Sequence, residues 1–119
     1  MKIKQQNPEL IETTRFLRIK TREFDAPIWK TLAKKLEKPK HSRCAVNLSR
    51  INRYTKEGET VTVPGKVLGS GILDHKVIVA AFSFSEEAKR KIGAAGGKCL
   101  TFSDLVQMNN KGADLKLIG

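Results

Sequence analysis

Val77–Phe82 is an unbroken run of six apolar residues that follows the turn-forming pair Asp74-His75. A short apolar run of this kind is typical of a strand buried on both faces, and such strands occur in parallel sheets covered by helices. The run is far shorter than the roughly 20 residues that cross a bilayer. We therefore expect an α/β fold built around this strand, with no membrane-spanning segment.

The rest of residues 57–119 alternates between short extended stretches and short helical ones. Extended segments are predicted at Thr60–Val63, Lys66–Leu73, Lys76–Phe82, Lys98–Thr101 and Leu115–Ile118, with a turn at Pro64-Gly65. One helix is predicted to start at Ser83 or Ser85 and to run through Ile92, and another to be capped by Ser103. After the first extended pieces, the order strand, helix, strand, helix, strand implies a small, largely parallel α/β sheet.

Residues 1–56 instead show helical spacing of their apolar residues. Helices are predicted at Asn7–Phe24, Pro27–Lys38 and Leu48–Thr55. On the first helix Arg15 and Leu17 differ by about 200° around the axis, so we expect its arginines to face away from the apolar side. Trp29 belongs to the apolar stripe of the second helix, which predicts a core residue rather than a platform for a base.

Nearly all of the net charge of +11 lies in residues 1–56, which hold nine lysines and six arginines against five acidic residues. Residues 57–119 hold eight basic and seven acidic residues. A surplus this concentrated favours a polyanionic partner, and a nucleic-acid backbone carries one phosphate per nucleotide. We therefore interpret residues 1–119 as a single domain with a basic helical part that faces RNA, residues 1–56, and an α/β core, residues 57–119.

Two glycine-rich stretches do not match nucleotide-binding fingerprints. Asp74 stands where the third glycine of a dinucleotide fingerprint starting at Gly69 would be, and Cys99 replaces the Ser or Thr that follows the lysine of a P-loop. His41 and Cys44 have no second pair of ligands to complete a metal site. Cys44 and Cys99 are expected to be free thiols in a reducing compartment. Because no constellation for nucleophilic or acid–base catalysis is present, the sequence disfavours an enzyme.

Several stretches together resemble the large-subunit ribosomal protein eighteen-e family of archaea and eukaryotes, and the resemblance spans essentially the whole chain. The most specific stretch is Val63-Pro64-Gly65-Lys66-Val67-Leu68-Gly69. The others are Lys38-Pro39 with its basic turn, Val46–Ile51, Gly58–Val63, Ala80–Ala88, Gly96-Gly97 and Leu105-Val106 with Asn109. The chain ends just after its last predicted strand and lacks the basic tail of eukaryotic members, so it resembles the compact archaeal form.

The resemblance implies irregular β-β-α units in an α/β fold shared with the C-terminal part of bacterial ribosomal protein fifteen. It also implies a structural role against large-subunit ribosomal RNA, contacts with neighbouring ribosomal proteins, a place on the cytoplasmic ribosome, and no catalytic activity or cofactor. The candidates for contact with RNA are the cations that the charge argument already selects, together with one histidine. They are Arg15, Arg18, Arg22, Lys34, Lys35, Lys38, Lys40, His41, Arg43, Arg50, Arg53 and Lys66. The connector at residues 40–43 is less arginine-rich than in many relatives, which leaves the role of His41 open.

One Trp and one Tyr are too few for an aromatic platform that stacks splayed bases, so recognition of RNA shape and backbone is expected. Two other classes of function stay open. A free-standing RNA-binding or regulatory protein would carry the same charges, and a nucleotide-dependent enzyme would need a phosphate loop. No apolar stretch follows the basic start, so we expect a soluble cytoplasmic protein without a secretory signal, a membrane partner or a small-molecule substrate.

Overall fold

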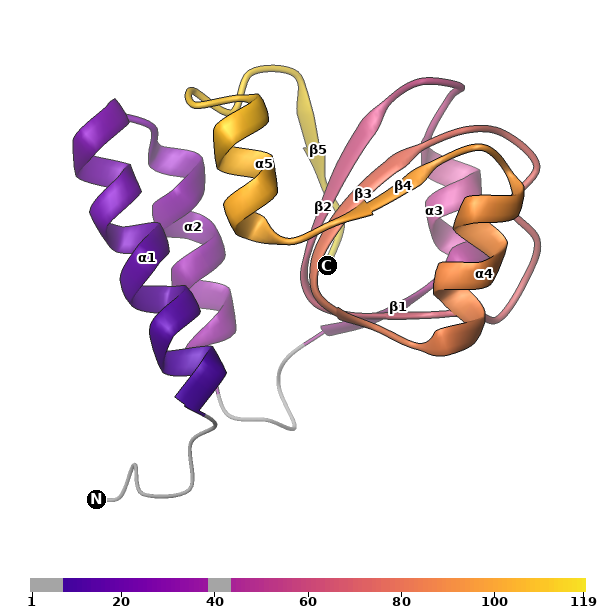
Figure 1. Cartoon of the computed structure of the whole chain (residues 1–119), viewed down its shortest axis with the longest axis horizontal. Helices are drawn as coiled ribbons and strands as arrows, with labels where there is room; N and C mark the ends of the chain where they lie inside the picture. Colours follow the sequence, from indigo (N-terminus) through magenta and orange to yellow (C-terminus); the bar gives the residue numbers. More distant parts are fainter. Residues whose placement is uncertain (1–7, 39–43) are drawn as a thin grey trace.

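Five parallel strands form one sheet in the computed structural model, which describes residues 8–38 and 44–119 (Figure 1). They are β1 (Cys44–Asn47), β2 (Thr60–Leu68), β3 (Ile78–Phe84), β4 (Lys98–Leu100) and β5 (Leu115–Leu117). The order across the sheet is β1-β2-β3-β4, and β5 also pairs with β2. Since β3 lies along one edge of β2, the other edge of β2 carries two strands in line: β5 beside Thr60–Thr62 and β1 beside Gly65–Leu68.

Helices cover both faces of this sheet, as the apolar run predicts. One face carries α1 (Pro8–Phe24), α2 (Pro27–Leu36) and α5 (Phe102–Met108), and the other carries α3 (Leu48–Tyr54) and α4 (Glu86–Ala94) (Figure 1). Val77, Val79 and Ala81 pack on the α3–α4 side. Ala80 and Phe82 pack on the opposite side. The predicted α/β class with N-terminal helices is therefore confirmed.

Trp29 is a core residue, as its place in the apolar stripe predicts. Its side chain is fully buried on α2, and its indole Nε1–H donates a hydrogen bond to the carbonyl oxygen of Asn110 at 2.9 Å. This bond links the helical pair to the loop before β5. Burial of the whole ring with its polar atom satisfied makes it a strong anchor for α2.

The turn predicted at Pro64-Gly65 is wrong, because both residues lie inside the continuous strand β2. The register between β2 and β3 shifts between Val63 and Lys66, which is a β-bulge. Proline has no N–H to donate to the ladder, and bulges are among the places where a sheet tolerates it. The strand then ends at Leu68, so the extended segment predicted to run to Leu73 is too long.

The cap predicted for α5 is also wrong by two residues. Thr101, not Ser103, is the N-cap: its hydroxyl accepts the backbone N–H of Asp104 at 3.1 Å, and the Asp104 carboxylate accepts the N–H of Thr101 at 3.2 Å. This capping box satisfies two helix-end donors reciprocally. For α4, Ser85 is the cap, and its hydroxyl accepts from Ala88 N–H at 3.1 Å.

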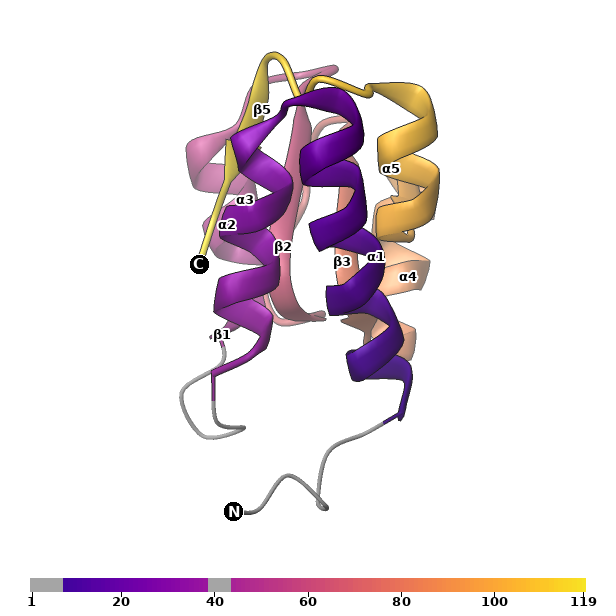
Figure 2. The same cartoon turned by 90° about the vertical axis from the view of Figure 1, so that its left-hand side faces the viewer.

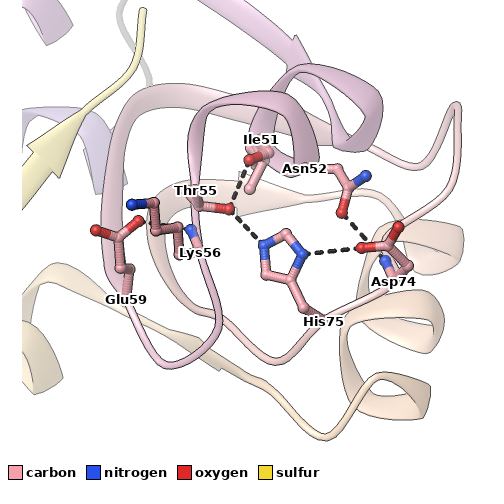
Figure 3. Close-up of polar contacts among 7 residues, drawn as sticks. All are labelled: Ile51, Asn52, Thr55, Lys56, Glu59, Asp74 and His75. Carbon is pink, nitrogen blue, oxygen red and sulfur yellow. Dashed lines mark hydrogen bonds and ion pairs between the residues drawn. The ribbon is translucent and has the colours of Figure 1, made fainter.

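A polar network fixes the C-terminal end of α3 to the loop before β3 (Figure 3). The Thr55 hydroxyl donates to the carbonyl of Ile51 at 2.7 Å and lies 2.8 Å from His75 Nε2, while His75 Nδ1 lies 2.9 Å from Asp74 Oδ1. The side chain of Asn52 on α3 accepts the backbone N–H of Asp74 at 3.1 Å. These bonds hold α3, and the arginines on it, in one position against the sheet.

The division at residue 56 follows charge rather than layers. Both β1 and α3 precede residue 56, yet β1 is a strand of the sheet and α3 packs on the core of residues 57–119. The N-terminal part therefore contributes to the scaffold as well as to the charged surface. As a division of function, the boundary stays a prediction.

Candidate nucleic-acid interface

Several unpaired cations meet at the edge of the sheet where β1 and β5 lie end to end. Lys35 in the last turn of α2 and Lys38, two residues beyond its end, lie at this edge, where they line a small cavity of about 50 Å³ with Cys44, Pro64 and Gly119. Figure 2 shows α2 in front of this edge, with β1 and the C-terminus beyond it. Two lysines from the helical layer therefore lie beside this edge of the sheet.

Cys44 reports on the charge at this edge. Burial raises the pKa of its thiol, and the cations of Lys35 on α2 and Arg50 on α3 act in the opposite direction. Two cations from opposite layers of the fold thus lie near one sulfur atom. The chain separates them in sequence by β1 and its connector, and the parallel pairing of β1 with β2 brings them together.

A groove of about 390 Å³ continues from this cavity along β5. Arg50, Tyr54 and Lys116 line it together with the last residues of the chain, and Gly119 also lines the cavity beside Lys35. Lys116 Nζ donates to the carbonyl oxygen of Tyr54 at 2.8 Å and lies 3.2 Å from the carboxylate of Glu59. We call Lys35, Lys38, Arg50 and Lys116 the basic edge.

A second group of cations lies on the outside of the two N-terminal helices. Arg18, Arg22 and Lys30 line a groove of about 250 Å³ with Thr21. Lys34 is exposed one helical turn beyond Lys30 on the same helix. We call Arg18, Arg22, Lys30 and Lys34 the outer helical face.

Arg18 differs from the other cations of the outer helical face because it has a carboxylate partner. Its guanidinium makes two hydrogen bonds to Glu37, with Nε 2.9 Å from one oxygen and Nη2 2.5 Å from the other. This bond to Glu37 raises the pKa of Arg18. The pair ties α1 to the end of α2, so part of the charge of Arg18 is neutralised within the protein.

Most of the other predicted cations have no such partner. Within residues 8–38 and 44–119, no ion pair forms at Arg15, Arg22, Lys34, Lys35, Lys38, Arg50, Arg53 or Lys66. By contrast, all three cations of α4 face carboxylates of their own helix, at 3.4–3.6 Å. Unpaired positive charge is thus concentrated away from α4.

The structure brings together only part of the predicted set. Lys35, Lys38 and Arg50 share the basic edge, and Arg18 and Arg22 share a groove with Lys30. Arg15 is exposed on α1 outside these grooves, and Lys66 is exposed on β2 beside Ala45 of β1. Arg53 places its guanidinium 5.8 Å from the ring centre of Tyr54. Lys40, His41 and Arg43 lie outside the described residues.

Sequence reasoning did not select Lys30 and Lys116. Lys30 was visible as part of the polar side of the second helix, four residues before Lys34. Lys116 lies in a strand of the nearly neutral part, and only the pairing of β5 with β2 places it beside Arg50. No local signal in the sequence identifies it.

Chemistry other than charge finds little support in the part of the chain that the structure describes. It contains no cluster of three or more metal-ligating side chains, and none of its helices is long and apolar enough to cross a membrane. Both cysteines are free thiols in the structure, and both are half-buried. Burial raises the pKa of the Cys99 thiol as well, which disfavours the reactive thiolate form.

The fold and these surfaces define a class: a small basic α/β protein with a parallel sheet and unpaired cations gathered on its helical layer and one sheet edge. The family model described as ribosomal protein 60S L18 and 50S L18e matches residues 2–119. The chain belongs to this family.

Curated relatives agree with this family over nearly the whole chain. The large ribosomal subunit protein eL18 of Methanothermobacter thermautotrophicus is 52% identical over 117 residues, which cover 98% of this chain and 97% of that protein. The eL18 proteins of Methanococcus maripaludis and Methanoregula boonei are 48% and 45% identical, with 98% of this chain and 98% and 96% of theirs covered. The predicted similarity to archaeal members of the family is confirmed.

Proposed function

We propose that this protein is a structural constituent of the large ribosomal subunit in the cytoplasm, and that it binds ribosomal RNA through the basic edge and the outer helical face. The observation that carries this proposal is the segregation of unpaired cations. Lys35, Lys38 and Arg50 converge on one edge, whereas each cation of α4 lies within 3.4–3.6 Å of a carboxylate of its own helix. Family membership supports the ribosomal context.

The basic edge and the outer helical face each combine lysine with arginine. Arginine presents a planar fork that can bridge two phosphates, while lysine supplies a simple cation. Tyr54 is a single exposed ring beside Arg53 rather than an aromatic platform. Recognition therefore depends on backbone shape and phosphate position. In this account the folded protein packs between RNA segments and neighbouring proteins and catalyses no reaction.

Sedimentation with large subunits tests this proposal. The chain with Lys35, Lys38 and Arg50 changed to Glu should be lost from the subunit after a high-salt wash that retains the unaltered chain. A matched variant with Lys76, Arg90 and Lys98 changed to Glu loses the same two lysines and one arginine from other elements and should stay bound. If the unaltered chain remains at the top of the gradient, the protein is instead a free-standing RNA-binding protein. If both variants are lost equally, the basic edge has no special role.

A further inference from the structure

One groove of this basic protein has acidic and apolar walls. It has a volume of about 340 Å³ and lies between the first half of α1, the second half of β3 and the start of α5. Glu9 and Glu12 line it from α1, and none of the described residues that line it is basic. Phe16, Phe82 and Phe102 supply its apolar surface. In a chain with a net charge of +11, such a groove repels phosphate and attracts cations.

The topology also places this groove where parallel sheets bind ligands. After β3 the chain crosses to α4 on one face of the sheet, and after β4 it crosses to α5 on the other face (Figure 1). Adjacent strands whose connections diverge in this way leave a crevice at their carboxyl ends. Ala81 and Phe82 of β3 and Thr101–Ser103 after β4 line the groove at that point.

The edge of β3 beside this groove has backbone groups that no described strand pairs. β4 pairs with β3 only from Ile78 to Ala80, and within residues 8–38 and 44–119 no other strand continues this edge past Ala80. An open strand edge offers N–H and C=O groups to an added extended segment. The groove therefore provides three kinds of contact side by side: carboxylates, aromatic surface and backbone.

We propose that this groove docks a peptide segment of a neighbouring protein that carries Lys or Arg together with an apolar side chain. The ammonium or guanidinium group meets the carboxylate of Glu12, and the apolar side chain packs on Phe16 and Phe82. The charge of the groove favours this occupant over RNA, which the basic edge and the outer helical face attract. The inference rests on the proposed place of the chain in the large subunit.

Photo-cross-linking in the assembled subunit tests the docking site. The full chain carries p-benzoylphenylalanine at Thr13, a half-buried position that lines the groove, and is reconstituted into large subunits. We expect an adduct that protease destroys and ribonuclease does not, joined to a segment in which Lys and Arg outnumber Asp and Glu. The same group at Gln107, exposed on α5 outside the groove, serves as the position control and should not give this adduct.

Charge variants complete the test. Glu9→Lys with Glu12→Lys should lower the yield of the adduct at least about tenfold, because interfacial charge pairs are reversed. Glu12→Gln should lower it less, with an unchanged melt. An adduct to RNA, to residues 1–7 of the same chain or to an acidic segment contradicts the inference. The absence of any adduct contradicts it as well, and so does an adduct yield that is the same in the charge variants as in the parent. Failure of the chain to join the subunit at all would instead count against the proposed function, so the two failures are distinguishable.

Discussion

Arg18 shows how a single carboxylate can remove a predicted contact residue from the free cationic surface. The periodicity of the first helix predicts correctly that the arginines point away from the core, and Arg15 and Arg22 are exposed. It does not predict that Glu37, 19 positions along the chain, binds Arg18 through both oxygens. That contact depends on how α1 and α2 fold back on each other, which no local pattern specifies.

Removing this carboxylate should strengthen binding to RNA. Glu37→Gln frees Arg18 and raises the net charge by one, so the slope of log K against log salt should steepen by up to about one. Thermal stability should change little, because exposed ion pairs contribute little to folding. Filter binding to large-subunit RNA fragments measures the slope, and unchanged binding would mean that Arg18 does not face RNA.

Trp29 should contribute to stability through its hydrogen bond as well as its ring. Trp29→Phe keeps an aromatic side chain but removes the part-buried hydrogen bond to the carbonyl oxygen of Asn110, which we expect to cost about 0.5–1.5 kcal/mol. Urea unfolding followed by circular dichroism measures the difference. Met108→Ala, at a half-exposed side chain, is the control and should change stability little. Equal stability of Trp29→Phe and the parent would show that the bond contributes nothing.

Among the elements, β2 and β1 are the ones that the sequence predicts least well. The pair Pro64-Gly65 is compatible with a turn or with a bulge, and the choice is made by the strands on either side of β2. β1 is only four residues long and exists because it pairs with the far half of β2. The helices were easier to predict because their apolar spacing and end residues are local signals, as at α2 and α4.

The close approach of β1 to the bulge requires glycine at position 65. A Cβ on Gly65 would lie 2.1 Å from the backbone oxygen of Cys44, so Gly65→Ala should destabilise the fold by about 1–3 kcal/mol and disturb the basic edge. Gly93 lies in α4, where a Cβ would meet no atom within 4 Å. Gly93→Ala should therefore stabilise the protein by up to about 1 kcal/mol. If the denaturant midpoints of the two variants shift in the same direction relative to the parent, this description of β2 is contradicted.

The polar contacts beside the C-terminal end of α3 should make the free energy of unfolding depend on pH in the acidic range. The hydrogen bond from His75 is the main cause that lowers the pKa of Asp74, and the backbone N–H of Lys56 is the main cause that lowers the pKa of Glu59. A lowered pKa in the folded state means that the stabilisation is complete above the unfolded-state value, near pH 4, and is lost as the pH falls through the folded-state value.

Asp74→Asn tests the sign of this dependence. The variant should be less stable than the parent at pH 6–7, and the difference should shrink as the pH approaches 3. Urea midpoints measured across this range give the comparison. A difference that grows towards low pH would contradict the contacts drawn in Figure 3.

At the scale of the whole molecule, the sequence shows which residues carry the excess charge but not which side of the fold they occupy. In the described part of residues 1–56 the basic residues lie mainly on α1, α2 and α3, and α3 packs on the opposite face of the sheet from α1 and α2. Only the sheet topology brings Lys35 and Arg50 to the same edge and adds Lys116 from the C-terminal strand. The sequence could not predict the acidic groove at α1 for the same reason, because the residues that line it come from three segments far apart in the chain.

The salt dependence of RNA binding tests the central claim most directly. If about six phosphates are neutralised, log K should fall with log salt at a slope of roughly −4 to −5 for the unaltered chain. With Lys35, Lys38 and Arg50 changed to Gln, the magnitude of the slope should fall by about 2–3. The same change at Lys76, Arg90 and Lys98 removes equal charge elsewhere and should leave it unaltered. Equal slopes for the two variants would contradict a localised basic edge.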